Sequence, residues 1–140
     1  MMVRMHQPPA APPAVRPWQV TTARAFPAVP GQVSAARRFL AALTEAFPAA
    51  DDALLCLSEV ATNAIQHSHS ARPGGQFTVR ATYAPGHLRV EVEDDGGPWQ
   101  PQAGHHEHGG RGLAILTALA RWDSTTDDGG HRTVWFEITV

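Results

Sequence analysis

LSEVATNAIQHS, residues 57–68, is the stretch that decides the fold, because it combines two side-chain patterns on one helix. Its apolar residues recur at intervals of three and four, which predicts a helix over residues 51–68 with one buried face. Glu59, Asn63 and His67 follow one another at steps of four. Four residues advance about 400° around a helix, so these side chains drift only about 40° per step and form one polar strip. A solvated face is the simplest interpretation of such a strip.

The segments around this helix predict an α+β fold. Apolar residues at helical spacing between Pro30 and Pro48 predict a second helix, and Asp51 or Asp52 is placed to cap the helix over 51–68. Alternation of apolar and polar residues predicts the strands. In chain order, we expect a strand at 18–26, helices within 30–48 and over 51–68, a hairpin over 76–93, a long loop, a helix over 109–122 and paired strands within 124–140. The helices should then cover one face of a mostly antiparallel sheet, as a two-layer α/β sandwich.

Composition excludes several function classes. All eleven basic residues are arginine. Without lysine, a Walker A phosphate loop, the strand lysine of eukaryotic-type protein kinases and Schiff-base chemistry are excluded. The single cysteine, Cys56, excludes an internal disulfide and cysteine-based zinc or iron–sulfur sites. The sequence also lacks the GxSxG motif of serine hydrolases. Any nucleotide chemistry must therefore proceed without lysine.

Charge and hydropathy argue against nucleic acid and membranes as partners. The formal net charge is -2 without a basic stripe, and no apolar run approaches the roughly 18 residues of a membrane span. Residues 1–17 are rich in proline and alanine and lack the apolar segment of a secretory signal. We therefore expect a cytoplasmic protein with a disordered tail over 1–17 and one domain over 18–140.

A second pattern ends the predicted hairpin, at VEVEDDGGPW, residues 90–99. Asp94, Gly96 and Gly97 are common turn formers, so a plain turn is one interpretation. A carboxylate at a strand end also accepts a hydrogen bond from the exocyclic amine of adenine, whereas guanine presents an acceptor at that position. Gly96, without a side chain, would let a base approach the backbone closely. The functional interpretation is that Asp94 selects ATP over GTP.

The third pattern is HGGRGLAIL, residues 108–116, in which glycines open the last predicted helix. Exposed backbone amides and the positive end of the helix dipole make such a helix start a phosphate site even without lysine. Glycine-rich helix starts are also common structural joints. This pattern therefore supports phosphate binding only in combination with the other two.

Together, the three patterns resemble the GHKL, or Bergerat-fold, ATPase family, and most closely its anti-sigma-factor serine/threonine kinases and their actinobacterial relatives. The helix motif ExxxN corresponds to Glu59 and Asn63, the strand-end motif to residues 94–98, and the loop motif GxGL to Gly110-Arg111-Gly112-Leu113. The closing HRTVWFEI is similar to the family's last strand, where a threonine, here Thr133, lies near the adenine. The resemblance covers roughly residues 18–140 and implies the Bergerat fold.

The resemblance also implies roles for individual residues, with ATP and Mg²⁺ as cofactors. Glu59 is the implied catalytic base, which takes a proton from a serine hydroxyl or from water. Asn63 is the implied Mg²⁺ ligand, through its neutral amide oxygen. His67 either orients the metal shell, contacts phosphate or is structural. The implied cofactor-binding set is Asn63, His67, Asp94, Gly96, Gly97, Gly110, Arg111, Gly112, Leu113 and Thr133.

The implied partners are other proteins, because the chain contains an ATPase-type module alone. In the resembling kinases, the phosphate acceptor is a serine on a STAS-fold antagonist of an anti-sigma factor, and the kinase alternates between that antagonist and a sigma factor. The implied role is regulation of transcription by partner switching, with a homodimer as the form that holds the sigma factor. The alternative is an ATP-binding regulatory module without kinase activity, which gates contacts between proteins.

Two further features concern the connection between the second and third patterns. Pro98 stands where many relatives have a further glycine, so a stiffer backbone is expected there. Residues 99–109 form a short predicted lid. This lid contains four consecutive residues whose side chains could bind a transition metal, His105, His106, Glu107 and His108. Adjacent residues seldom chelate one ion with good geometry, so we expect a solvated, mobile lid instead of a metal site.

Overall fold

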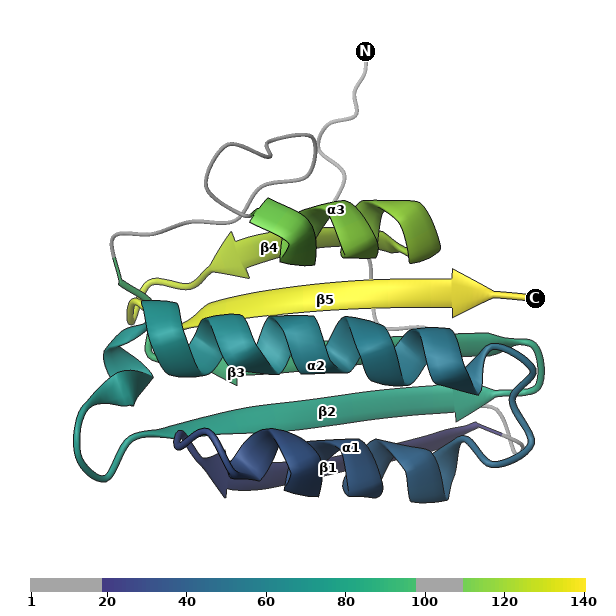
Figure 1. The fold of residues 1–140 in the computed structure, drawn as a ribbon, viewed down its shortest axis with the longest axis horizontal. Coiled ribbons are helices and arrows are strands. Elements are labelled where there is room, and N and C mark those ends of the chain that lie inside the picture. The colour runs from purple at the N-terminus through teal and green to yellow at the C-terminus, as the bar shows by residue number, and fades with distance from the viewer. Residues whose placement is uncertain (1–18, 98–109) are drawn as a thin grey trace, which may run out of the picture.

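A five-stranded antiparallel sheet forms one layer of the protein, and three α-helices form the other (Figure 1). The computed structural model describes residues 19–97 and 110–140, without the side chains of residues 110–112. All described helices lie on one face of the sheet, with α2 between α1 and α3 (Figure 1). This arrangement confirms the predicted α+β sandwich with helices on a single face.

The elements follow one another in the predicted order. They are β1 (Val20–Pro27), α1 (Gln32–Leu43), α2 (Ala50–His67), the 3₁₀ turn η1 (His69–Ala71), β2 (Gln76–Ala84), β3 (His87–Asp94), α3 (Gly110–Leu119), β4 (Arg121–Thr126) and β5 (Arg132–Thr139). The strand order in the sheet is β1-β2-β3-β5-β4, and every neighbouring pair is antiparallel. The last two strands therefore meet as a hairpin, with β5 inserted beside β3.

The hydrophobic core lies between the two layers and is built by strict alternation along the central strands. In β3 and β5, every second residue is buried while the residues between them are partly exposed. The buried positions face the helices and join one cluster with residues such as Leu40, Leu57 and Leu116 from the three helices. Burial of each such side chain contributes roughly 1.5–3 kcal/mol to folding. The sheet therefore has one apolar face and one polar face.

The other face of the sheet has a lattice of ion pairs instead of helices. Arg89 Nη1 donates to Glu137 Oε2 at 2.8 Å, and Arg89 Nε donates to Glu91 Oε2 at 3.0 Å. Arg121 also donates to Glu137. The Arg89 guanidinium lies over the Trp135 ring, 4.4 Å from its centroid. Cross-strand pairs of this kind stabilise neighbouring strands and keep the face compatible with water.

The structure corrects several predicted helix ends. α2 has Ala49 as its N-cap without a side-chain cap, so Asp51 and Asp52 lie in the first turn. There they face the positive end of the helix dipole instead of capping it. α3 ends at Leu119, and Trp122, predicted at the end of this helix, lies buried in β4. The reason is that Trp122 pairs across the sheet with a core residue of β5, which a local helical pattern does not include.

Some predictions concern residues outside the described ranges. They are the tail over 1–17, Pro98 and the lid over 99–109 with His105, His106, Glu107 and His108. Among the described helices, none combines the length and apolarity that a membrane crossing requires.

Cys56 generates a first prediction, because its side chain is fully buried in the core. Burial, with the nearby charges of Asp52 and Glu59, raises the pKa of the Cys56 thiol to about 12. The thiolate is the reactive form, so the folded protein should not react with a disulfide reagent such as DTNB at pH 8. One thiol per chain should react after unfolding in guanidinium. Rapid reaction of the native protein would contradict this burial.

Glu137 generates a second prediction. Partial burial raises the pKa of Glu137, but hydrogen bonds and charges from Arg89 and Arg121 outweigh it and hold the pKa below its ordinary value. A lowered carboxyl pKa stabilises the fold above the pKa of the unfolded chain, and this contribution is lost as pH falls through the folded pKa. Glu137→Gln should therefore lower the free energy of unfolding by about 1 kcal/mol at pH 7.

The pH dependence separates this ion pair from simple packing. In urea unfolding, wild type and Glu137→Gln should converge as pH falls through the lowered pKa that Glu137 has in the folded protein, because both side chains are neutral below it. Glu45→Gln, at an exposed position, is the matched control and should change little at either pH. A stability difference that is constant from pH 7 to pH 3 would show that the charge of Glu137 is irrelevant.

Candidate functional site

The polar strip of α2 lies on the side of this helix that faces away from α1. Arg37 of α1 donates to Ser58 Oγ at 2.6 Å, which marks the side of α2 that faces α1. Glu59, Asn63 and His67 lie about 100° to 180° around the helix from Ser58, on the side toward α3. Glu59 and Asn63 are half-buried, and His67, the last residue of α2, is exposed. The helix is continuous through all three, so they stand one turn apart as predicted.

Asp94, the last residue of β3, is buried in an ion pair. Its Oδ1 accepts from the Gly96 amide at 2.7 Å, and its Oδ2 accepts from Arg132 Nη2 at 2.9 Å and from Arg132 Nε at 3.3 Å. Both side chains are 2% exposed. Burial raises the pKa of Asp94 above its ordinary value, since the hydrogen bonds and charge of Arg132 and the Gly96 amide offset it only in part. The carboxylate that the sequence assigns to adenine is thus paired within the protein.

The turn after β3 is held against the end of α2 by a short serine-containing segment. Ser70 Oγ accepts from the Asp95 amide at 2.9 Å, and the Gly96 carbonyl accepts from the His69 amide at 2.7 Å. Ser68 Oγ in turn accepts from the Ser70 amide at 2.9 Å. The sequence analysis missed these residues. Serines directly after a helix are typical of such local side-chain to backbone turns, so the signal was present.

The two glycines of this turn have a packing role. Gly96 has φ +72°, and a Cβ on it would lie 2.1 Å from the Gly130 carbonyl oxygen. Gly97 has φ +141° and lies beside the His69 ring. On the side where a Cβ would point, the turn between β4 and β5 fills the space beside Gly96. Gly96 is required where two turns of the protein touch.

The start of α3 lies at the same end of the molecule as the strip and the Asp94 turn. Figure 1 shows the end of α2, the end of β3, the start of β5 and the start of α3 together. Gly110 and Gly112 belong to the first turn of α3. Leu113 is 3% exposed and packs in the core, so its side chain anchors this helix instead of facing a ligand. The side chain of Arg111 lies outside the described part.

The last strand places Arg132 beside Asp94, and Thr133, which the family resemblance assigns to the neighbourhood of the adenine, is the next residue. Thr133 pairs with Glu93 and alternates with the buried residues Arg132 and Val134, so it lies on the open face of the sheet. Arg132 pairs directly with Asp94 and faces the helices. Alternate residues of a strand face the same side, so Arg132 lies on the same face as the core residues Val134 and Phe136. The sequence pattern therefore contained a signal for Arg132, which was not among the predicted site residues.

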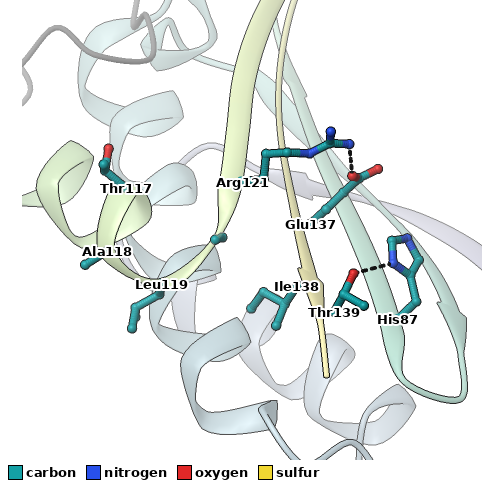
Figure 2. Close-up of a pocket in the computed structure, with 9 residues that line it drawn as sticks. His87, Thr117, Ala118, Leu119, Arg121, Glu137, Ile138 and Thr139 are labelled. Carbon is teal, nitrogen blue, oxygen red and sulfur yellow. Dashed lines mark hydrogen bonds and ion pairs between the residues drawn. The ribbon is translucent and has the colours of Figure 1, made fainter.

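The hollow in Figure 2 is separate from these residues. It has a volume of about 590 Å³ and lies where the end of α3, the start of β4 and the end of β5 meet. Figure 2 shows the ion pair of Arg121 with Glu137 and the hydrogen bond of His87 Nδ1 with Thr139 Oγ1, at 3.1 Å. None of its lining residues belongs to the predicted site. The predicted residues gather at the opposite ends of β3 and β5.

Comparison with known families agrees with this geometry. A family model described as "Histidine kinase-like ATPase domain" matches residues 26–138, most of the chain. The chain therefore belongs to the histidine kinase-like ATPase domain family and has its GHKL, or Bergerat, fold. Membership supports an ATP-binding module of GHKL type, with ATP-dependent phosphotransfer as general chemistry and Mg²⁺ as the usual metal. A search of curated proteins found no match for the chain.

The described residues fit Mg²⁺ and phosphate better than they fit the adenine base of a nucleotide. Asn63 offers a neutral oxygen on a half-buried strip, and a hard cation such as Mg²⁺ accepts such a ligand. The first amides of a helix have no acceptor within the helix, so the first turn of α3 is suited to phosphate. Asp94, in contrast, already accepts three hydrogen bonds from the protein. The elements that the resemblance assigns to Mg²⁺ and phosphate are thus compatible with the described structure, whereas the carboxylate that it assigns to adenine is paired within the protein.

The contact between the two turns generates a third prediction. Gly130 has φ +86° with nothing near a Cβ, so Gly130→Ala should cost about 1–2 kcal/mol of stability from backbone strain alone. Gly96→Ala adds a clash with the Gly130 carbonyl and should cost about 3 kcal/mol or more. Thermal and urea unfolding of both variants measure the difference. Equal losses would show that Gly96 is not held against that carbonyl.

Proposed function

We propose that this chain is an ATP-binding serine/threonine protein kinase of the anti-sigma-factor type. It phosphorylates a STAS-type antagonist and regulates a sigma factor by partner switching in the cytoplasm. The observation that carries the proposal is that the end of α2, toward which the Glu59–Asn63 strip runs, lies at the same end of the sheet as the Asp94 turn and the glycine start of α3. A base, a metal ligand and phosphate-binding amides are the parts that phosphoryl transfer needs.

Each residue has a specific task in this proposal. Asn63 holds Mg²⁺ through its amide oxygen, and the metal neutralises charge on the phosphates when it is bound. Glu59, one turn earlier on the same strip, takes the proton of the acceptor hydroxyl. The backbone amides at Gly110 and Gly112 hold the β- and γ-phosphates, and the dipole of α3 adds to this attraction. His67 and Arg111 lie next to these groups in sequence and support phosphate or metal binding.

The phosphate acceptor is proposed to be a serine on a separate protein. The three sequence patterns supply binding and base functions, and the proposal assigns the acceptor hydroxyl to the STAS-type antagonist. The sigma factor and a second copy of the chain are the other proposed partners. The half-buried position of Glu59 on the outer layer of helices leaves its strip open to an incoming protein segment.

A regulatory module without phosphotransfer is the second candidate, and one observation favours it. Asp94 is engaged by Arg132 and is 2% exposed, so base recognition competes with a contact inside the protein. A protein that binds ATP only under some conditions is suited to gate a contact between other proteins. The two candidates differ in whether phosphate ever reaches a serine.

Glu59→Gln provides the fourth prediction and separates the candidates. Removal of a general base should lower serine phosphorylation by about 10²–10⁴-fold and leave Mg-ATP binding nearly unchanged. The measurement is transfer of labelled γ-phosphate from Mg-ATP to a panel of STAS proteins from the same organism, with calorimetry for binding. Glu45→Gln, an exposed glutamate outside the strip, is the control and should retain full transfer.

The outcomes assign the function directly. If the wild type binds Mg-ATP but labels no protein of a complete STAS panel, the regulatory module replaces the kinase. If Glu59→Gln transfers phosphate as fast as the wild type, Glu59 is not the base. Loss of transfer in Glu59→Gln with intact Mg-ATP binding supports the kinase.

A further inference from the structure

We infer that Arg132 competes with the nucleotide base for the carboxylate of Asp94. The Arg132 guanidinium must leave this carboxylate before an adenine can bind there. This inference rests on the proposed function, because it concerns the base-recognition residue of the same site. It adds a residue that limits nucleotide affinity. The ligand class is a nucleotide whose base presents a neutral exocyclic amine.

The first step concerns the strength of the contact that the base must replace. Arg132 donates to Asp94 Oδ2 through Nη2 at 2.9 Å and through Nε at 3.3 Å. The Arg132–Asp94 contact joins two opposite full charges through two donors, and ion pairs of this kind are among the strong hydrogen bonds of proteins. The amine of adenine is a neutral donor. The base therefore loses a direct competition for Asp94 unless stacking and phosphate contacts add to its binding.

The second step concerns access. Both side chains of the pair are 2% exposed, and Asp94 Oδ1 is already bonded to the Gly96 amide at 2.7 Å. A carboxylate covered to this degree offers no open edge to an approaching base. Opening the pair exposes Oδ2, which is the oxygen that Arg132 covers. Removal of Arg132 from this oxygen is therefore a condition of base recognition at Asp94.

The third step concerns whether Arg132 is able to move. Asp94 is the last residue of β3, and Arg132 is the first residue of β5. In the sheet, Arg132 pairs with Asp94 on one side and with Thr126 on the other. Rotation of the Arg132 side chain away from the carboxylate leaves these backbone pairs in place. The pair thus sits where it can open without unfolding the sheet.

These steps define two states of the site. In the closed state, Arg132 covers Asp94, and in the open state the base amine replaces it. When the competent state is a minor population, the apparent dissociation constant rises by the inverse of that population. Nucleotide affinity in this chain is therefore set by the stability of the pair as well as by contacts with ATP.

Arg132→Met tests the inference, since methionine has a long side chain without charge or donors. Mg-ATP binding should tighten by about tenfold or more, because the competing contact is gone. Arg80→Met is the matched control: Arg80 forms an ion pair with Glu91 at 2.9 Å on the open face of the sheet, and its loss should leave binding unchanged. Calorimetry at pH 8 measures both, and circular dichroism verifies that each variant is folded.

A second measurement uses the wild type, so that the test does not depend on a stable variant. The Arg132 side-chain Nε–H resonance in nitrogen-15 NMR, assigned by its absence in Arg132→Lys, should shift strongly and exchange faster with solvent at saturating Mg-ATP. An unchanged, protected resonance at saturation would show that the pair stays closed around bound nucleotide and would overturn the inference.

The outcomes also distinguish this inference from the proposed function. If neither wild type nor folded Arg132→Met binds Mg-ATP, the proposed function fails and the inference with it. If the wild type binds and Arg132→Met binds equally or more weakly, Arg132 is not a competitor, and the proposed function stands. Tighter binding in Arg132→Met, with no change in Arg80→Met, supports both.

Discussion

The buried ion pair of Asp94 and Arg132 is the interaction on which one end of the molecule depends. It joins the last residue of β3 to the first residue of β5, and both side chains are 2% exposed. Removal of two charges from water is costly, and the cost is offset only while the partners stay together. The same carboxylate also accepts from the Gly96 amide and so orients the turn that follows. The turns after β3 and β4 are thereby held in contact.

Charge is distributed very differently on the two faces of the sheet. On the face toward the helices, the described strands bury apolar side chains, and the Asp94–Arg132 pair stands at their edge. On the open face, arginines and glutamates such as Arg89 and Glu137 alternate across neighbouring strands. These pairs are partly solvated, so each contributes little alone and the lattice acts as a group. The absence of lysine means that planar guanidinium groups make all of these contacts, including the one over Trp135.

The candidate site combines parts held by packing with a carboxylate held in an ion pair. Glu59 and Asn63 stand on a helix whose opposite face is buried in the core, so their spacing is held by packing. The start of α3 is anchored by the buried Leu113. The base-recognition carboxylate alone is engaged within the protein. In this chain of an ATP-binding family, the carboxylate that we assign to base recognition is thus held by Arg132.

The sequence by itself determined the element order, the single helical layer and the strip of Glu59, Asn63 and His67, because these depend on periodicity within a few neighbouring residues. It selected Asp94 as the carboxylate at the strand end, and the structure buries Asp94 and exposes Asp95. It did not identify Arg132, which contacts Asp94 although the two residues are 38 positions apart in the sequence. Only the tertiary structure decided these points. Strand register assigns each residue to a face and a partner, and register is set by the pairing of distant segments.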